Sequence, residues 1–365
     1  MKLVDVDRKT YVAYGAQSRA QGISSIHWVT YGESVCVCRV NGKVEVWDVA
    51  GDGKSLEQSH TLEVGEGDSG SSVRALGCGG LGSQTPATSL FYTEAGHVTV
   101  RATDASSSGA GSFQVRGPVE SVAASTTRAV FGGKENDLEL WDLERGESVW
   151  TAKNVPHDEV RLRVPVWIAG VQFFGADADG DSDVIVTGTG HCHIRLYDVR
   201  VQRQPVVTFN TENEFRVTRV SAASDGQRLF VSDAVGGLQA WDVRKQRLVR
   251  SVRGFAGSIR DLQQSADGDV LVAGGLDRYI RAVDTTTGHI INGVYLKNRV
   301  NACCVWSARG GKGKKRGGGD DDNDEDESEE ESDDDSEASD RLQTLEMSDS
   351  EEEDSDVASE AEDVN

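Results

Sequence analysis

The stretch Gly275-Leu-Asp-Arg-Tyr-Ile-Arg-Ala-Val-Asp284 decides the fold of this chain. A glycine-containing turn carries Asp277, and a strand-like run follows and is closed by Asp284. This pattern is the second half of a WD-type repeat. One such short strand cannot bury its own two faces, so copies of the repeat must stack on one another.

The motif recurs six times along the chain. The copies end at Trp47-Asp48, Val100-Arg101, Trp141-Asp142, Tyr197-Asp198, Trp241-Asp242 and Val283-Asp284. Successive copies are 54, 40, 56, 44 and 42 residues apart. A four-stranded propeller blade takes about 40–45 residues, so the two long spacings indicate insertions. We expect these insertions to be surface loops at 65–82 and 176–183, which are rich in Gly, Ser and Asp.

The two ends of this region suggest one more blade. Residues 300–306 form an inner-type strand pattern after the last repeat, and residues 2–6 and 10–13 form strand patterns before the first. Pairing the ends in one blade would close the ring and remove its exposed sheet edge. The sequence therefore predicts an all-β fold, a seven-bladed WD40-type β-propeller over residues 1–308, although the N-terminal part is one strand short.

The formal net charge of −23 is distributed very unevenly. Residues 320–365 hold 25 acids and one arginine, whereas residues 309–319 hold five bases and no acid. Residues 1–308 are close to neutral, at about −4. The acidic segment has no aromatic residue and few aliphatic ones, so burial cannot offset its chain entropy. We expect a disordered acidic C-terminal tail at 320–365, joined by a basic linker at 309–319.

The basic linker is a candidate nuclear import signal, carried by Lys312, Lys314, Lys315 and Arg316. Contact with RNA phosphates is a second interpretation, and a solubilising linker is a third.

The acidic tail carries candidate phosphorylation sites for an acid-directed kinase. Ser328, Ser332, Ser348, Ser350 and Ser359 each stand three residues before an acid. A tail of this charge suits the binding of basic proteins, and a merely solvated tail is the alternative.

Nothing in the sequence indicates an enzyme, a cofactor or a metal site. No Walker loop, G-x-S-x-G motif or cysteine nucleophile context is present. His191-x-His193 lies in a turn and lacks a third ligand at useful spacing. The six cysteines form no C-x-x-C motif, and we expect them to be reduced core residues.

Asp277 is expected to have a structural role, accepting hydrogen bonds within the tight turn before the third strand of its blade. The other blades carry different residues at this position, namely Asn41, Ala95, Glu135, His191 and Val235. The blades are therefore predicted to depend on packing more than on a polar network.

Two short boxes give an alternative function. Tyr197-Asp-Val-Arg200 and Trp241-Asp-Val-Arg244 match the box found in WD-repeat substrate receptors of cullin-RING ubiquitin ligases. An arginine two residues after the aspartate is common in WD repeats, so this signal has low specificity.

The segments between the repeats are more specific than the repeats. They include Gly132-Gly-Lys-Glu-Asn136, Leu162-Arg-Val-Pro-Val-Trp167, Gly254-Phe-Ala-Gly-Ser-Ile-Arg260 and Val294-Tyr-Leu-Lys297. In this order they resemble the WD-repeat ribosome-assembly factor family of the early nucleolar pre-60S particle. The resemblance covers about residues 130–306 and is weak over the first two blades.

The resemblance implies a non-enzymatic scaffold in the nucleolus, within the nucleus, that acts in assembly and rRNA processing of the large (60S) subunit precursor. It implies a protein that is monomeric within the pre-60S particle, contacts assembly factors and rRNA, and is released by an AAA-type ATPase. The C-terminal extension of this family is typically basic and serves nuclear targeting, and the acidic tail of this chain departs from that pattern. The residues implied to contact a partner or rRNA are Lys134, Glu135, Asn136, Lys153, Arg163, Trp167, Arg260, Arg278 and Lys297.

Overall fold

The computed structural model describes residues 1–15, 22–50, 55–62, 73–78, 88–102, 110–157, 160–176, 181–211, 214–223 and 225–306. The described residues contain strands and turns and no helix. The predicted basic linker and acidic tail, with their import and phosphorylation residues, lie outside the described part of the chain.

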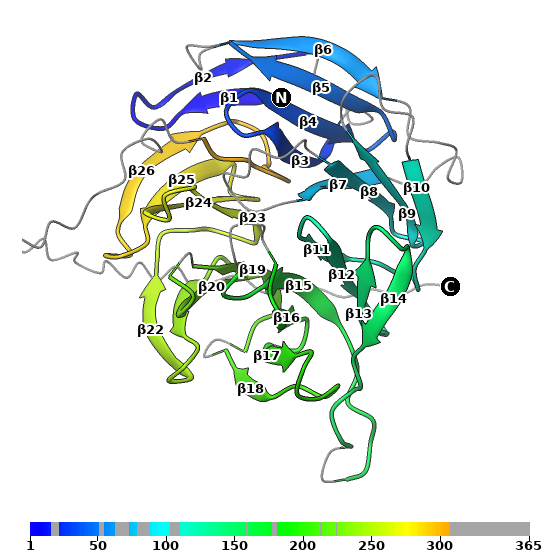
Figure 1. The fold of residues 1–365 in the computed structure, drawn as a ribbon. Coiled ribbons are helices and arrows are strands. Elements are labelled where there is room, and N and C mark those ends of the chain that lie inside the picture. The colour runs from blue at the N-terminus through cyan, green and yellow to red at the C-terminus, as the bar shows by residue number, and fades with distance from the viewer. Residues whose placement is uncertain are drawn as a thin grey trace, which may run out of the picture. The chain divides into compact units, whose positions relative to one another are not determined.

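Six four-stranded antiparallel sheets are arranged around a central axis (Figure 1). Each sheet is formed by four consecutive strands, so the chain completes one blade before it begins the next. The first three blades consist of β3 (Ile23–Thr30), β4 (Ser34–Arg39), β5 (Val44–Val49) and β6 (Leu56–Leu62); β7 (Val73–Cys78), β8 (Thr88–Thr93), β9 (His97–Ala102) and β10 (Ala110–Gln114); and β11 (Ser121–Ala124), β12 (Arg128–Gly133), β13 (Asn136–Asp142) and β14 (Glu147–Thr151).

The next three blades repeat this order. They consist of β15 (Ile168–Phe173), β16 (Val184–Thr189), β17 (His193–Asp198) and β18 (Val207–Asn210); β19 (Val217–Ala222), β20 (Arg228–Asp233), β21 (Leu238–Asp242) and β22 (Arg247–Val252); and β23 (Ile259–Gln264), β24 (Val270–Gly275), β25 (Tyr279–Asp284) and β26 (Ile290–Tyr295). Each of the six repeat motifs ends in the third strand of a blade, which confirms the all-β WD40-type propeller.

One predicted loop is wrong in part. The segment expected to be a surface loop at 65–82 contains β7, the first strand of the second blade. Glycine and serine around Val73–Cys78 obscured this short strand in the sequence. Ala75 within it is buried, and the strand pairs with β8 along its whole length.

The core lies between neighbouring blades. The second strand of every blade is buried at all but its first residue, because both faces of each sheet are covered. Between the third and fourth blades, for example, Leu138 and Leu140 pack with Ile168 and Ile185. Apolar packing therefore joins neighbouring blades along these strands.

The two ends of the described chain meet between the sixth and first blades. Strands β1 (Lys2–Asp5) and β2 (Thr10–Ala13) form a separate two-stranded sheet. Residues 300–306 lie beside it, and Val300 and Cys303 share a cluster with Val4 and Tyr11. The prediction of a seventh blade is not confirmed, because residues 300–306 do not join a sheet.

Residues 300–306 instead connect the two flanking blades. The Cys303 amide donates to the Asp261 carboxylate of β23 at 2.8 Å. On the other side, the Trp28 Nε1 of β3 donates to the Val305 carbonyl at 2.8 Å. Burial raises the pKa of Asp261, although the nearby Arg219 guanidinium and the backbone amides of Cys303 and Leu262 act in the opposite direction.

Candidate functional site

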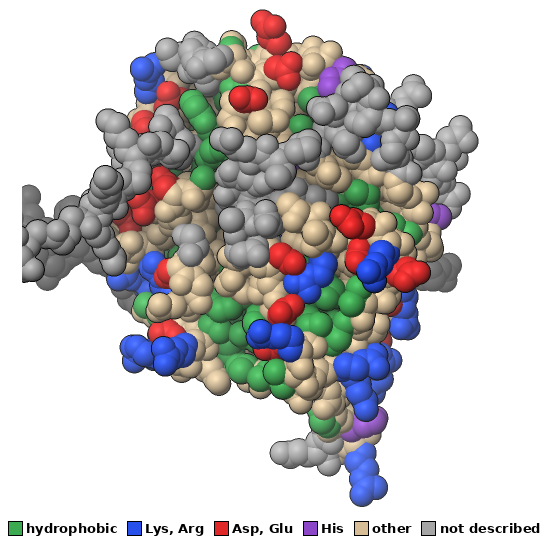
Figure 2. All heavy atoms as spheres, in the orientation of Figure 1, with side chains coloured by type: hydrophobic (Ala, Val, Ile, Leu, Met, Phe, Trp, Pro, Cys, Tyr) green, Lys and Arg blue, Asp and Glu red, His purple; other side chains and the backbone are tan. Residues whose placement is uncertain are grey.

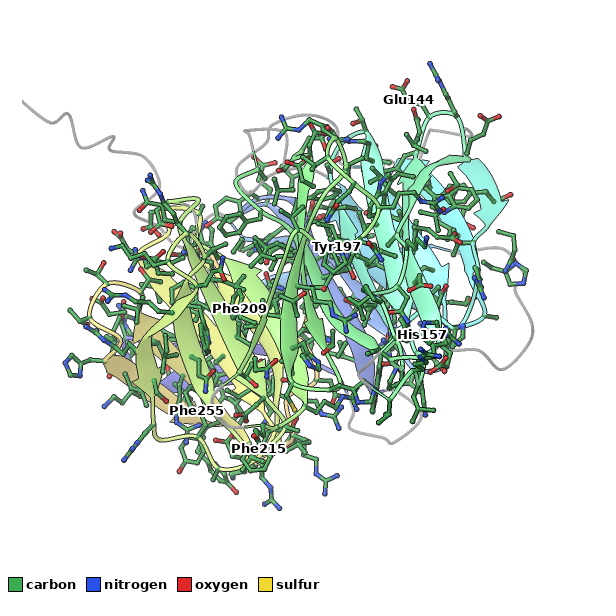
Figure 3. The ribbon with its side chains drawn as sticks, turned by 90° about the horizontal axis from the view of Figure 1, so that it is seen from below. Glu144, His157, Tyr197, Phe209, Phe215 and Phe255 are labelled. Atoms are coloured by element: carbon green, nitrogen blue, oxygen red, sulfur yellow. The ribbon has the colours of Figure 1, made fainter. Side chains whose placement is uncertain are left out.

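The antiparallel order of the strands gives the propeller two distinct faces. The turns from second to third strand and the connections between blades emerge at one end of the sheets, which we name the connection face. The other turns emerge at the opposite face. Figure 3 shows this separation, with Phe215 and Phe255 of two blade connections at one end and Glu144 at the other.

The predicted contact residues come from segments that all emerge at the connection face. They occupy second-to-third-strand turns, blade connections or the strand ends beside them. Exposed members of the set are Lys134, Glu135, Lys153, Arg163, Arg260, Arg278 and Lys297.

Trp167 lies at the centre of a group of charged side chains. Its indole Nε1 donates to the Glu120 carboxylate at 2.8 Å. The Arg216 guanidinium lies 4.1 Å from the indole ring centroid, and the Lys134 ammonium lies 5.4 Å from it. The ring is half-buried, so we assign Trp167 the role of holding these two cations beside each other.

The space around the Trp167 ring is closed by Gly190. A Cβ added to Gly190 would lie 2.3 Å from Trp167 Cδ2, so only a glycine permits this approach. The main chains are also joined, because the Gly190 amide donates to the Trp167 carbonyl at 2.8 Å. Blade four and the connection before it are therefore fixed together at this point.

Glu120 and Arg216 were not found from the sequence. The Glu120 carboxylate forms an ion pair with Arg216 at 3.6 Å, and the Glu120 carbonyl accepts from Arg74 at 3.3 Å. Arg74 lies in β7 of the second blade, Glu120 in the connection before the third blade and Arg216 in the connection before the fifth. No local pattern links such residues, because only the stacking of blades brings them together.

Glu135 and Arg163 form a second exposed pair, with 3.3 Å between the guanidinium and the carboxylate. Asp137, two residues further on, is half-buried, and this burial raises the pKa of its carboxyl. The positive charges of Arg163, Arg116 and Arg195 oppose that shift.

Asn136 differs from the other predicted contact residues because its side chain is buried, at 1% exposure. Its amide nitrogen donates to the Arg116 carbonyl at 2.5 Å and to the Pro118 carbonyl at 3.2 Å. The side chain therefore holds the preceding connection in place, and it does not lie on the surface.

The turn aspartate of the sixth blade accepts a hydrogen bond within its turn. The Asp277 carboxylate accepts from the Tyr279 amide at 3.1 Å and is ion-paired with Arg281. A second turn carboxylate was missed in the fifth blade. Asp233 accepts from the amides of Val235, Gly236 and Gly237 at 2.9, 2.8 and 2.7 Å.

The histidines and cysteines of the described residues offer little reactivity. No group of three histidine, cysteine, aspartate or glutamate side chains is placed to hold a metal in this part of the chain. His193 is partly buried, which lowers its pKa. The thiols of Cys36 and Cys303 are buried and their pKa values are raised, for Cys36 by a hydrogen bond with Cys38 and by burial, and for Cys303 by burial.

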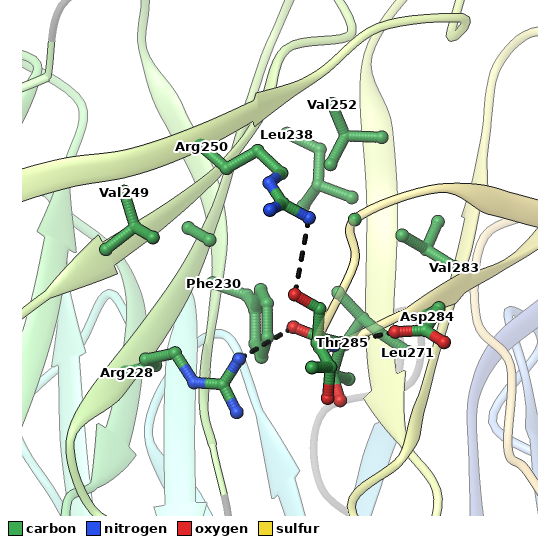
Figure 4. Close-up of a pocket in the computed structure, with 13 residues that line it drawn as sticks. Arg228, Phe230, Leu238, Val249, Arg250, Val252, Leu271, Val283, Asp284 and Thr285 are labelled. Atoms are coloured by element: carbon green, nitrogen blue, oxygen red, sulfur yellow. Dashed lines mark hydrogen bonds between the residues drawn. The ribbon is translucent and has the colours of Figure 1, made fainter.

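A small cleft lies between the fifth and sixth blades (Figure 4). Its volume is about 20 Å³, close to the space of one water molecule and far below that of a substrate pocket. Arg228 and Arg250 cross it to donate to the carbonyls of Thr285 and Thr286 at 2.8 and 3.3 Å. The cleft therefore forms part of the contact between blades.

The surface is not uniformly basic. The view in Figure 2 shows acidic and basic side chains together around an apolar area that lies over β15 to β20. A region that binds a polyanion must therefore be a local patch. The described part of the chain contains no helix with the length and apolar character that a membrane crossing requires.

Comparison with known proteins identifies the repeats and several relatives. The profile of the family described as "WD domain, G-beta repeat" matches residues 246–284. "WD repeat-containing protein 74" of Bos taurus is 38% identical over 182 residues, which is 49% of this chain and 45% of that protein. "Ribosome biogenesis protein NSA1" of Meyerozyma guilliermondii is 29% identical over 222 residues, 50% of this chain and 54% of that protein.

A longer alignment extends this likeness. "Ribosome biogenesis protein nsa1" of Schizosaccharomyces pombe is 26% identical over 316 residues, 78% of this chain and 77% of that protein. The chain spans about half the length of the mammalian relatives it matches. These names confirm the resemblance drawn from the inter-repeat segments, and they give no support to a ubiquitin-ligase receptor. In the first of the two boxes, Arg200 is engaged with Asp198 at 3.1 Å.

Proposed function

We propose that this chain, a relative of WD repeat-containing protein 74 and of the ribosome biogenesis protein NSA1, is a non-enzymatic scaffold in ribosome biogenesis. Its role would be in the nucleolar assembly and rRNA processing of the large (60S) subunit precursor. The observation that carries this proposal is the likeness to NSA1 proteins, one of which aligns over 78% of the chain.

The connection face is the proposed contact surface with the pre-60S particle. Two arguments support it. The residues implied by the family resemblance come from segments that emerge there, and the Trp167 group holds Lys134 and Arg216 beside one another. A scaffold needs a preformed surface, and such a cluster is fixed before any partner arrives.

Several finer points belong to the same proposal. Residues 300–306 and the β1–β2 hairpin would take the seventh position of the ring, and the hydrogen bonds of Val305 with β3 and of Cys303 with β23 support this. The chain would be monomeric within the particle and would be released by an AAA-type ATPase. Nuclear import would use Lys312, Lys314, Lys315 and Arg316, and the serines of 320–365 would be phosphorylated.

Affinity purification of the full chain from nuclear extract tests this function. The expected result is recovery of large-subunit precursor rRNA together with assembly factors. Recovery of mature cytoplasmic ribosomes alone, or of a cullin complex without precursor rRNA, would contradict the proposal. A double variant of Arg200→Ala and Arg244→Ala serves as the control for the ligase alternative, and it is expected to leave the recovered rRNA unchanged.

A further inference from the structure

Two tyrosines lie side by side at the connection face of the sixth blade. Tyr279 begins β25 and Tyr295 ends β26, and the two residues are direct partners in the register. Their ring centroids are 5.1 Å apart, with 47° between the ring planes. Both side chains are exposed, at 36% and 43%. The pair therefore adds aromatic surface to the outside of the blade instead of filling the core.

A cation flanks each tyrosine. Arg278 directly precedes Tyr279, and Lys297 follows Tyr295 by two residues; both are exposed. The Leu296 amide donates to the Arg278 carbonyl at 2.8 Å, which joins the two segments. The Arg278 guanidinium also lies 3.4 Å from the Tyr295 hydroxyl. Arg278 contacts the tyrosine pair and Lys297 lies close to it in the chain, and we name these four residues the Tyr279–Tyr295 site.

Both cations stand in an unfavourable backbone conformation. The φ angles of Arg278 and Lys297 are 68° and 63°, in a region that side chains with a Cβ rarely adopt. The first two blades place Gly42 and Gly96 at the turn position of Arg278, which is the residue type that fits there without strain. Cys192 has the same φ of 68° at this turn position in the fourth blade, so the turn itself sets the conformation, and asparagine is a suitable replacement there.

Within residues 253–300, the exposed charges near the Tyr279–Tyr295 site have one sign. Residues 253–300 are all described, and their exposed cations near this face are Arg253, Arg260, Arg278, Lys297 and Arg299. The carboxylates of the same stretch are occupied or distant. Asp277 is ion-paired with Arg281, and Asp261 is buried. The remaining three, Asp267, Asp269 and Asp284, lie in or beside turns of the opposite face. The Tyr279–Tyr295 site is therefore expected to attract a polyanion.

We propose that the Tyr279–Tyr295 site binds single-stranded RNA, in which bases stack on Tyr279 and Tyr295 while Arg278 and Lys297 contact phosphates. Exposed aromatic rings interleaved with cations are the surface that single-stranded nucleic acids use. The Arg281 guanidinium, 4.5 Å from the Tyr279 ring centroid, supports that ring from within. An acidic peptide would use the cations but would leave the two rings without a role. This inference rests on the proposed function, which brings the chain to precursor rRNA.

Binding of the full chain to a fluorescent single-stranded RNA of about ten nucleotides tests the inference, since such sites take about 4–16 nucleotides. Tyr295→Ala is expected to weaken binding about fivefold or more, whereas Tyr295→Phe keeps the ring and stays near the wild-type affinity. The double variant Arg278→Asn with Lys297→Asn removes both cations and places a residue that tolerates positive φ. It is expected to bind about tenfold more weakly and to lower the salt slope of log affinity by about 1.4, at about 0.7 per phosphate contact.

Two controls separate binding from folding and from total charge. The thermal midpoint of the double variant is expected to equal or exceed that of the wild type, because the strain at both positions is relieved. Arg244→Asn with Lys245→Asn removes the same charge from exposed positions in the turn between β21 and β22, at the opposite face, and is expected to bind RNA as the wild type does.

Three outcomes would overturn the inference: no binding of the single strand, wild-type binding by Tyr295→Ala or by the Arg278→Asn, Lys297→Asn double variant, or binding of a polyglutamate peptide in preference to RNA. If any of these occurs while purification still recovers precursor rRNA, the proposed RNA binding at the Tyr279–Tyr295 site is wrong and the proposed function stands. If precursor rRNA is also absent, the proposed function fails with it.

Discussion

The Asp277 carboxylate and the Arg281 guanidinium form an ion pair that is almost closed to solvent. Their side chains are 6% and 13% exposed. Arg281 also lies 5.0 Å from the centroid of the Phe255 ring, which belongs to the preceding blade connection. The turn aspartate of the sixth blade therefore holds its own turn and, through Arg281, positions a neighbouring connection.

Replacement of Asp277 by alanine is expected to destabilise the propeller by about 3 kcal/mol, because it leaves the buried Arg281 charge without its partner. Urea denaturation followed by tryptophan fluorescence measures the change. Arg145→Ala is the matched control, since Arg145 is 78% exposed and lies 3.9 Å from Asp142. Loss of that surface pair is expected to cost less than about 1 kcal/mol. Equal effects of the two variants would contradict the role given to Asp277.

Asp233 gives a second prediction in the fifth blade. Its carboxylate accepts three amides of one turn, so Asp233→Ala removes the acceptor for all three. We expect a loss of about 2 kcal/mol in the free energy of unfolding, because the freed amides lie in a partly buried turn. Asp233→Asn keeps one acceptor oxygen and is expected to lose less. If asparagine and alanine destabilise equally, these hydrogen bonds do not carry the stability of the turn.

His27 predicts a dependence of stability on pH. It is 7% exposed, and burial lowers its pKa from 6.5 to about 4. Between these values the unfolded chain binds a proton that the folded chain does not. Stability is therefore full above pH 6.5 and falls as the pH decreases towards 4, by about 1.4 kcal/mol per pH unit for this one group.

The measurement for His27 is the difference in unfolding free energy between wild type and His27→Gln from pH 7 to pH 4. The pH-dependent part of that difference is expected to reach about 3 kcal/mol. The exposed His157 provides the control, since His157→Gln is expected to leave the pH profile unchanged. A profile of His27→Gln that is parallel to the wild type would show that His27 does not contribute.

The sequence predicted the blades because each third strand ends in a recognisable pattern, such as Leu-Gln-Ala-Trp241-Asp242. It predicted that the two ends of the propeller meet, and Val300 does pack with Val4. It did not predict the pairing there. Alternating apolar residues report burial, and Val300 and Cys303 are buried although residues 300–306 do not join a ladder. The hidden strand β7 shows the same limit, since flanking glycines resemble a loop.

The contact surface was predictable only in part. Cations in turns, such as Lys134 and Arg278, are visible in the sequence because turn residues are usually exposed. Partners from other blades, such as Glu120 beside Trp167, are set by stacking and leave no local signal. Asp233 was missed because its carboxylate reaches the turn amides from two positions earlier than Asp277 does.

The close approach of Gly190 to Trp167 allows the last prediction, which joins the Trp167 group to the proposed function. In Gly190→Ala the new methyl would lie 2.3 Å from Trp167 Cδ2, so the indole must move away from Glu120 and Arg216. We expect a loss of about 1–3 kcal/mol in stability from this overpacking, a shift in tryptophan emission and reduced recovery of precursor rRNA. Gly111→Ala is the matched control, because a Cβ at Gly111 meets nothing within 4 Å. If Gly190→Ala shifts the emission and yet recovers precursor rRNA as the wild type does, the Trp167 group is a structural joint between blades and not part of the contact surface.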